Sequence, residues 1–284
     1  MSAGGPRVCR DVPSLRAALA PARREGRRIG LVPTMGALHE GHLSLVDAAR
    51  RDCDVVVVSI FVNPLQFGPD EDYETYPRDL DGDVRLLGSR GVDLVFAPEV
   101  QQFTPPDMRT TVHVADLTER LEGASRPGHF DGVTTIVTKL LSVVGPERAY
   151  FGEKDYQQLV VVRRMVADLG LPVTIVAGPI VRDEDGLALS SRNAYLSADE
   201  RRAALALSRA LREAADAWDG DADAARMRLR TTLEQAPGVR LDYAEVVDPE
   251  TLVPLEGVVD GAARALVAAY VGRTRLIDNI RLER

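Results

Sequence analysis

Cysteine and long hydrophobic runs are both scarce in this 284-residue chain. Its two cysteines, Cys9 and Cys53, allow at most one disulfide, which excludes the bridge framework of small secreted domains and is typical of a reducing cytoplasm. The longest apolar run, VVVVSIFV at 55–62, is far shorter than the roughly 20 residues of a membrane-spanning helix. The N-terminus lacks the apolar segment of a signal peptide. We therefore expect a cytoplasmic protein with no membrane partner.

Positive charge is in deficit too, with 35 basic against 43 acidic side chains and a formal net charge of −8. No overall positive field exists to attract a nucleic acid, so we expect no nucleic-acid partner. All but two of the basic residues are arginine; the lysines are Lys139 and Lys154, and asparagine occurs only at positions 63, 193 and 279. A lysine in such a chain indicates a need for a compact cation, although chance placement is the alternative.

Glycine-rich phosphate-binding signatures are absent as well. The chain contains neither the P-loop sequence nor G-x-G-x-x-G. A nucleotide would have to be bound by other means.

Apolar runs and helical patterns alternate through the first two-thirds of the chain. Five continuous runs predict buried strands, at 28–34, 54–63, 92–98, 148–152 and 173–181. Between them, helical patterns predict helices at 42–51, 80–91, 131–144 and 154–170. This alternation indicates an α/β fold with a doubly wound parallel sheet, whose ligands bind at the carboxyl ends of the strands.

The pattern changes after about residue 181. Two charged amphipathic helices, at 197–218 and 221–236, precede three strand-like segments at 239–248, 263–272 and 274–282. We expect a nucleotide-binding domain over 1–180 and a smaller α+β domain over 181–284.

The stretch PTMGALHEGH, residues 33–42, contains two of the four histidines. It follows a predicted strand and opens a predicted helix, where unpaired backbone N–H groups and the helix dipole favour a phosphate. Gly36 and Gly41 allow close approach, and His39 and His42 can donate hydrogen bonds to it. One alternative is that both histidines are ordinary polar groups. A metal site is a weaker one, because the spacing differs from H-E-x-x-H.

Three further stretches offer polar groups at strand ends or loops. FGEKD (151–155) leads into a helix, where Lys154 can reach a phosphate or simply be solvated. GLALSSRN (186–193) offers two hydroxyls, a guanidinium and an amide, suited to closing over a triphosphate or to an N-cap and turn. FVNPLQF (61–67) offers neutral amides that suit hydroxyl and carboxylate groups or satisfy loop backbone.

Six ordered motifs together resemble one family. PTMGALHEGH, FVNPLQF, YPRDL, SRPGHFDGV, FGEKDYQQL and DGLALSSRNAYLS, spanning about 31–197, resemble the pantothenate synthetase (pantoate–β-alanine ligase) family. The resemblance implies a Rossmann-like nucleotidyltransferase fold, a C-terminal lid domain and a homodimer. It also implies a two-step ligation in which pantoate and ATP form pantoyl adenylate, and β-alanine then displaces AMP.

The resemblance also implies the site residues. His42 is implied as proton donor, with His39 and Lys154 beside it. The implied ATP contacts are Pro33, Thr34, Met35, Gly36, His39, Gly41, His42, Gly152, Glu153, Lys154, Asp155, Val181, Leu189, Ser190, Ser191 and Arg192. Pantoate and β-alanine are implied to contact Met35, Asn63, Gln66 and Gln158.

The family implies Mg²⁺ on the triphosphate, with Asp81 and Asp83 as its candidate ligands. Relatives carry adjacent acidic residues where this chain has Asp81, Gly82 and Asp83, so the ligand assignment is open. Arg126 and His129 either lie at the site or order its loop.

Two rival functions are enzymatic, and a third belongs to a different class. Another adenylyl-transferring enzyme, one that joins a nucleotide to a phosphate ester, would share the histidine pair but would not need the amides of FVNPLQF and YQQL. A tRNA-charging enzyme is disfavoured by the acidic charge balance. A regulatory nucleotide-binding module would bind ATP without turnover.

Overall fold

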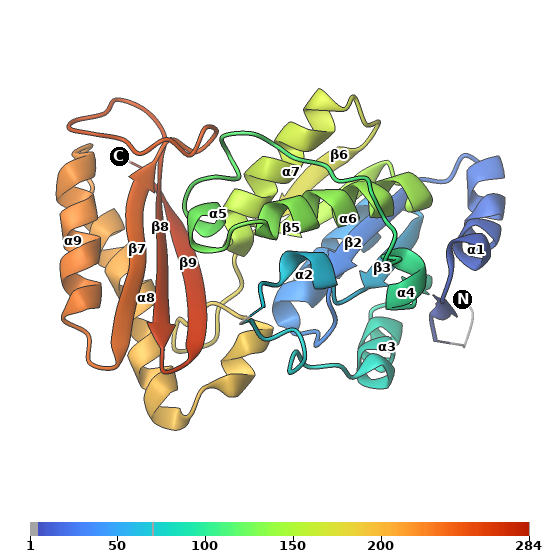
Figure 1. Ribbon diagram of the computed structural model, residues 1–284, viewed down its shortest axis with the longest axis horizontal. Coiled ribbons are helices and arrows are strands. Elements are labelled where there is room, and N and C mark those ends of the chain that lie inside the picture. The colour runs from blue at the N-terminus through green and yellow to red at the C-terminus, as the bar shows by residue number, and fades with distance from the viewer. Residues whose placement is uncertain (1–4, 70, 284) are drawn as a thin grey trace. The chain divides into compact units, whose positions relative to one another are not determined.

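The computed structural model describes residues 5–69 and 71–283, shown in Figure 1. The chain divides into two compact units. The first runs to residue 153 and resumes over 161–179, and the second comprises 154–160 and 180–284.

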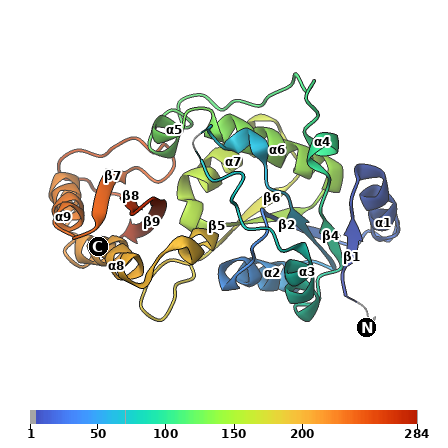
Figure 2. The same cartoon turned by 60° about the horizontal axis from the view of Figure 1, so that its bottom comes forward.

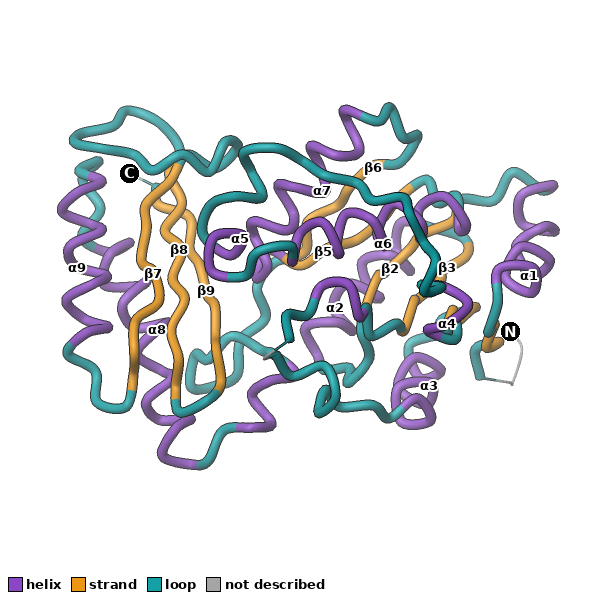
Figure 3. Tube along the Cα trace, in the orientation of Figure 1, coloured by secondary structure: helices purple, strands orange, loops and turns teal. Residues whose placement is uncertain are grey.

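A parallel sheet forms the centre of the first unit. Its strand order in the described residues is β1-β4-β3-β2-β5-β6, and every neighbouring pair is parallel. The strands, drawn in orange in Figure 3, are β1 (Arg7–Cys9), β2 (Ile29–Thr34), β3 (Val55–Ile60), β4 (Leu94–Phe96), β5 (Arg148–Gly152) and β6 (Thr174–Gly178). The sheet confirms the doubly wound α/β prediction.

Helices cover both faces of this sheet, because parallel strands need crossover connections. Figure 2 shows α2 and α3 on one face and α6 on the other. The helices of this part of the chain are α1 (Val12–Arg24), α2 (Glu40–Asp52), α3 (Leu80–Ser89), α4 (Val100–Phe103), α5 (Glu122–Ser125), α6 (His129–Val144) and α7 (Tyr156–Asp168). Short 3₁₀ turns, η1 (Pro64–Gln66) and η2 (Glu153–Asp155), follow β3 and β5.

The N-terminal β1 and α1 were not among the predicted elements. Three residues are too few for an apolar run to mark β1. Helix α1 begins at a capping box in which Asp11 accepts from the Ser14 N–H at 2.7 Å, with Pro13 in its first turn. That cap is a sequence signal for a helix start.

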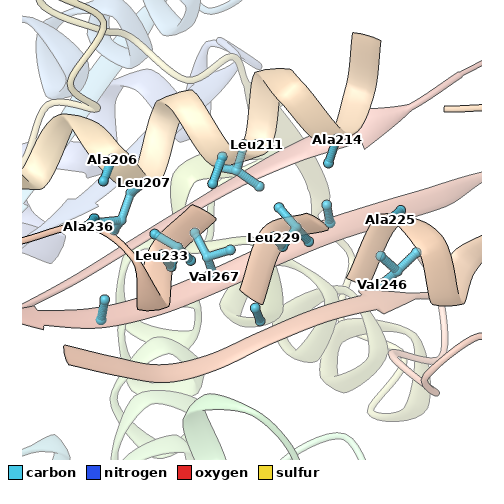
Figure 4. Packing of buried hydrophobic residues seen from close by; sticks show 14 of the residues in the cluster. Ala206, Leu207, Leu211, Ala214, Ala225, Leu229, Leu233, Ala236, Val246 and Val267 are labelled. Carbon is cyan, nitrogen blue, oxygen red and sulfur yellow. The ribbon is translucent and has the colours of Figure 1, made fainter. Parts of the chain in front are cut away.

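The second unit packs two helices against an antiparallel sheet. After η3 (Ser191–Tyr195), its elements are α8 (Ala198–Asp216), α9 (Ala222–Glu234), β7 (Val239–Val247), β8 (Ala263–Val271) and β9 (Thr274–Leu282), with strand order β7-β8-β9. Leu211 of α8, Leu229 of α9 and Val267 of β8 are fully buried between helices and sheet (Figure 4). Alanines fill much of the remaining interface, which allows close helix–sheet packing. The predicted α+β unit is confirmed.

No helix in the described part of the chain has the length and apolar character needed to cross a lipid bilayer.

Candidate functional site

The site begins where the strand order of the first unit reverses. The chain passes from β2 to β3 and β4 on one side, then to β5 on the other side of β2. Ladder pairing between β2 and β5 comprises Gly30 with Arg148 and Leu31 with Ala149, before either strand reaches its carboxyl end. A reversal of this kind is where doubly wound proteins bind ligands. Pro33 and Thr34 end β2 at this edge, and Gly152 ends β5 there.

A strained turn connects β2 to α2. Gly36 and Ala37 are consecutive residues with positive φ, at 84° and 49°. The left-handed conformation costs an alanine free energy and persists only where the surroundings support it. A Cβ on Gly36 would lie 2.9 Å from Asp83 Oδ2 and 3.1 Å from Ile60 Cγ2, so this position needs glycine for space as well as for conformation.

Asp83 of α3 supports that turn. Its Oδ2 accepts the N–H of Ala37 at 3.0 Å, and its Oδ1 accepts the N–H of Leu38 at 2.9 Å. The carboxyl is buried, and this burial raises its pKa above the ordinary value even though the two backbone N–H groups oppose the shift. Asp83 therefore stabilises the conformation of the loop from Met35 to His39.

The two histidines cap α2 reciprocally. His39 is the N-cap, and its Nδ1 accepts the N–H of Gly41 at 3.2 Å, while Nδ1 of His42 accepts the N–H of His39 at 3.4 Å. Their ring centroids are 4.1 Å apart. Because each Nδ1 is an acceptor, the proton of each neutral ring resides on Nε2, which is the tautomer able to donate from that edge. The predicted pair thus shares one helix start.

The loop after β3 lies against the same region. Asn63 is buried, and its Nδ2 donates to Gln66 Oε1 at 2.9 Å and to the carbonyl of Gly132 at 3.0 Å. Gln66 Nε2 lies 3.2 Å from the sulfur of Met35. The structure therefore brings Met35 of PTMGALHEGH together with Asn63 and Gln66 of FVNPLQF.

A network behind η1 orients Gln66 from its backbone side. His129 Nδ1 lies 2.8 Å from the Gln66 carbonyl oxygen, and Arg126 NH2 donates to the same oxygen at 3.3 Å. Arg126 also makes a bidentate pair with Glu71, with both contacts at 2.6 Å. These contacts order the loop that carries Gln66, which is one of the two roles expected of Arg126 and His129. Glu71 was missed, since one carboxylate in an acidic loop carries no distinguishing signal.

The surroundings of His129 favour the neutral form of its ring. Its Nδ1–H donates to the Gln66 carbonyl, which leaves Nε2 to accept from Arg126 NH1 at 3.2 Å. Desolvation, with the Arg126 charge beside it, lowers the pKa of His129 to about 4. The pKa of Glu71 is lowered as well: its burial opposes this shift, and the hydrogen bonds and charge of Arg126 outweigh it.

The predicted residues Lys154, Asp155 and Gln158 belong to the second unit. Glu153 ends the first stretch of the first unit. Lys154 and Asp155 lie in η2, with Lys154 Nζ 3.9 Å from Asp155 Oδ1. The carbonyl of Lys154 accepts from Nδ2 of Asn279 at 2.9 Å. Gln158 is half-buried on α7.

The predicted serine-rich stretch forms a short antiparallel turn in the second unit. Arg182 bridges Ala188, and the Leu189 N–H donates to the carbonyl of Val181 at 2.9 Å. Ser190 then caps η3 by accepting the N–H of Arg192 at 3.3 Å, and Ser191 follows it in η3. The stretch therefore forms the predicted turn and N-cap, and Ser190 marks the residue at which the loop ends and η3 begins.

The described residues contain no group of three histidine, cysteine, aspartate or glutamate side chains arranged to hold a metal ion. Asp81 is exposed in the first turn of α3, and Asp83 is buried two residues later.

The sheet reversal, the strained turn and the paired histidines define a class: α/β enzymes that bind a phosphate-bearing ligand at the carboxyl edge of a Rossmann-like sheet. Comparison with known proteins defines the family. The family model described as pantoate-beta-alanine ligase matches residues 7–281. Pantothenate synthetase of Mycolicibacterium smegmatis is 56% identical over 96% of this chain and 85% of its own. That of Acidobacterium capsulatum is 58% identical over 90% and 86%.

Solved structures agree. Pantothenate synthetase from Thermus thermophilus matches with a TM-score of 0.92 and 52% identity, covering 98% of this chain and all of that one. The pantoate-beta-alanine ligase from Francisella tularensis, complexed with beta-gamma ATP and beta-alanine, matches with a TM-score of 0.80 and 34% identity, covering 97% of both chains. The chain belongs to the pantoate–β-alanine ligase family.

Proposed function

We propose that this chain condenses pantoate with β-alanine at the expense of ATP. In the first step a carboxylate oxygen of pantoate attacks the α-phosphorus, forming pantoyl adenylate and expelling pyrophosphate. In the second step the amine of β-alanine attacks the acyl carbon, forming the amide, losing a proton and expelling AMP. Family membership supports this reaction, as does the ATP and β-alanine in the Francisella tularensis relative.

The observation that carries the proposal is the pair of capping histidines at the end of β2. Their Nδ1 atoms accept backbone N–H groups, so each neutral ring carries its proton on Nε2 and can act as a donor from that atom. Neutral donors stabilise the charge that develops on phosphate oxygens as pyrophosphate departs. We assign His42 as the proton donor and His39 to the phosphates.

The remaining assignments follow the motifs. Lys154 supplies a mobile positive charge to the phosphates. Further ATP contacts are assigned to Pro33, Thr34, Met35, Gly36, Gly41, Gly152, Glu153, Asp155, Val181, Leu189, Ser190, Ser191 and Arg192. The carboxamides of Asn63, Gln66 and Gln158, with the side chain of Met35, are assigned to pantoate and β-alanine. No covalent enzyme intermediate is needed, so catalysis rests on positioning and charge stabilisation.

Magnesium is part of the proposal. Asp81 and Asp83 would hold the ion, which would neutralise negative charge on the triphosphate. Asp81 is exposed in the first turn of α3 and fits an outer carboxylate ligand. Each oxygen of Asp83 accepts one backbone N–H and retains a second lone pair, so both carboxylates remain assigned to the metal.

Three further expectations belong to the proposal: a cytoplasmic location, a homodimer and a lid role for residues 181–284. The first is supported by two buried, unbridged cysteines, and the second by the family. A lid would shelter the mixed anhydride from water. Unchanged hydrogen-exchange protection of residues 186–193 on adding ATP and pantoate would exclude the lid role.

Pyrophosphate exchange tests the function. Labelled pyrophosphate should enter ATP only when pantoate is present, because pyrophosphate re-forms ATP by attacking pantoyl adenylate, and that adenylate forms only from pantoate and ATP. His42→Ala and Lys154→Ala should abolish exchange. His113→Ala is the matched control, because this histidine is half-exposed, pairs with Asp131 and is not among the assigned residues. Exchange without pantoate, or normal exchange in both variants, would overturn the assignment.

A further inference from the structure

Asn279 is the one asparagine of the chain that lies in none of the motifs. Asn279 is 1% exposed, and its neighbour Asp278 is 4% exposed. Successive residues of a strand point to opposite faces of the sheet. The side chains of Asp278 and Asn279, both on β9, therefore reach two different segments of the second unit.

Asn279 holds the backbone of Lys154. Its Oδ1 accepts from Arg264 Nε at 2.9 Å and from NH2 at 2.6 Å, so its Nδ2 is the donor at the opposite end of the amide. That Nδ2 donates to the Lys154 carbonyl at 2.9 Å. Arg264 is itself buried, with its guanidinium 3.9 Å from the ring centroid of Tyr156, two residues after Lys154. The segment that carries Lys154 is thus attached to β9 and β8.

Asp278 holds the other segment. Its carboxylate makes a bidentate pair with Arg182, at 2.6 and 2.9 Å. Arg182 NH1 also donates to the carbonyl of Gly186 at 3.1 Å, and its backbone bridges Ala188. The ion pair therefore closes the turn that leads directly into the assigned Leu189–Arg192 segment. A buried carboxylate with two charge-assisted hydrogen bonds is a rigid anchor for such a turn.

We propose that Asp278 and Asn279 are positioning residues that fix, from one strand, the two ATP-binding segments of the second unit. This inference rests on the proposed function, because it takes Lys154 and Leu189–Arg192 as ATP contacts. Neither residue touches substrate; each acts through the backbone of the segment it holds. Loss of either anchor should therefore weaken the use of ATP more than the use of pantoate.

Two nearly isosteric variants test it. Asn279→Asp keeps the acceptor for Arg264 and replaces the donor to Lys154 with a carboxylate oxygen, which repels the Lys154 carbonyl. Asp278→Asn keeps the shape and removes the charge that holds Arg182. Asp242→Asn is the matched control, because Asp242 pairs with Arg275 of the same strand β9 at 2.6 Å. The exchange assay gives KM for ATP, KM for pantoate and the maximal rate, and thermal unfolding gives Tm.

We expect both test variants to raise KM for ATP by about 10-fold or more, as small misplacements of binding groups do. KM for pantoate should stay within about twofold, and the Asp242→Asn control should match the wild type in both. Asp278→Asn should also speed amide exchange at Leu189, whose N–H is bonded to Val181. Should Asp278→Asn not fold, Asn279→Asp decides alone.

The outcomes distinguish failure of the positioning role from failure of the proposed function. If the wild type exchanges and Lys154→Ala does not, but both test variants follow the control in every constant, the positioning role is overturned and the function stands. Equal increases of KM for ATP and pantoate, in proportion to a fall in Tm, overturn it as well. A wild type without pantoate-dependent exchange overturns the proposed function itself.

Discussion

The histidine corner of the first unit and the serine-rich turn of the second are supported in different ways. In the first, a backbone with two consecutive positive-φ residues is held by one buried carboxylate, Asp83. In the second, an ordinary antiparallel turn is held by an ion pair from β9. A strained loop needs a close acceptor for its own N–H groups, whereas an unstrained turn needs only an anchor for one side chain. The first should therefore tolerate substitution less.

The largest effect should follow from Asp83→Ala. Two N–H groups of the turn would lose a charged acceptor, each hydrogen bond being worth about 1.5–3 kcal/mol, and Ala37 would leave its left-handed conformation. We expect exchange activity to fall at least 100-fold, by about 3 kcal/mol or more in the transition-state free energy. Steady-state exchange measures it.

A control for Asp83→Ala distinguishes loss of the loop conformation from loss of a metal ligand. Asp81→Asn should leave the loop intact and alter only the Mg²⁺ concentration that half-saturates exchange. Should Asp83→Ala keep near-normal activity at saturating Mg²⁺, the support of the strained turn by this carboxylate would be disproved.

A second effect concerns pH and His129. The folded pKa of about 4 lies below the ordinary 6.5, so the neutral ring stabilises the fold fully above pH 6.5. As the pH falls toward 4, the unfolded chain takes up this proton first, and about 3 kcal/mol of the free energy of unfolding should be lost. Urea unfolding at pH 6.5 and pH 4 measures it.

His129→Gln is the reference for that experiment, because glutamine does not titrate. The variant should lose about 3 kcal/mol less than the wild type between the two pH values, while Glu71 and the other carboxylates titrate in both proteins. Parallel pH profiles would show that the ring is not held neutral.

Gly132→Ala should have a smaller effect, restricted to the pantoate side. A Cβ at this position of α6 would lie 2.2 Å from the Leu65 carbonyl oxygen and 2.6 Å from the Gln66 nitrogen, so η1 must move. We expect KM for pantoate to rise about 10- to 30-fold, or about 2 kcal/mol. Gly261→Ala is the control, since nothing lies within 4 Å of its Cβ position. An unchanged KM for pantoate would remove Gln66 from the assigned pantoate contacts.

The smallest effect is expected for Glu71→Gln. Arg126 keeps its hydrogen bonds to the Gln66 carbonyl and to a neutral amide, so the loop should loosen by about 1 kcal/mol and activity should fall a few-fold. Comparing exchange at low and high salt checks this, because salt should weaken the wild-type pair but not the variant. A loss as large as that of Asp83→Ala would show that the Glu71–Arg126 pair supports the site as strongly as Asp83 does.

Sequence reasoning succeeded where the signal is local. The strand-to-helix corner at 33–42 and the amphipathic second unit follow from runs and periods within a few residues of each other. The supporting residues are distant: Asp83 is 46 positions from Ala37, Glu71 is 55 from Arg126, and Asn279 is 125 from Lys154. No period connects such pairs, and one aspartate among many looks like any other. Strand order likewise depends on packing between distant segments.

The most direct test of the proposed chemistry follows the oxygen of the carboxylate. Pantoate labelled with ¹⁸O in its carboxyl group should transfer one label to AMP in each turnover with ATP and β-alanine, because that oxygen becomes the bridge of pantoyl adenylate. Mass spectrometry of the nucleotide product reads it. One ¹⁸O in each AMP is the result expected here, whereas unlabelled AMP, or ADP as the nucleotide product, would contradict an adenylate intermediate.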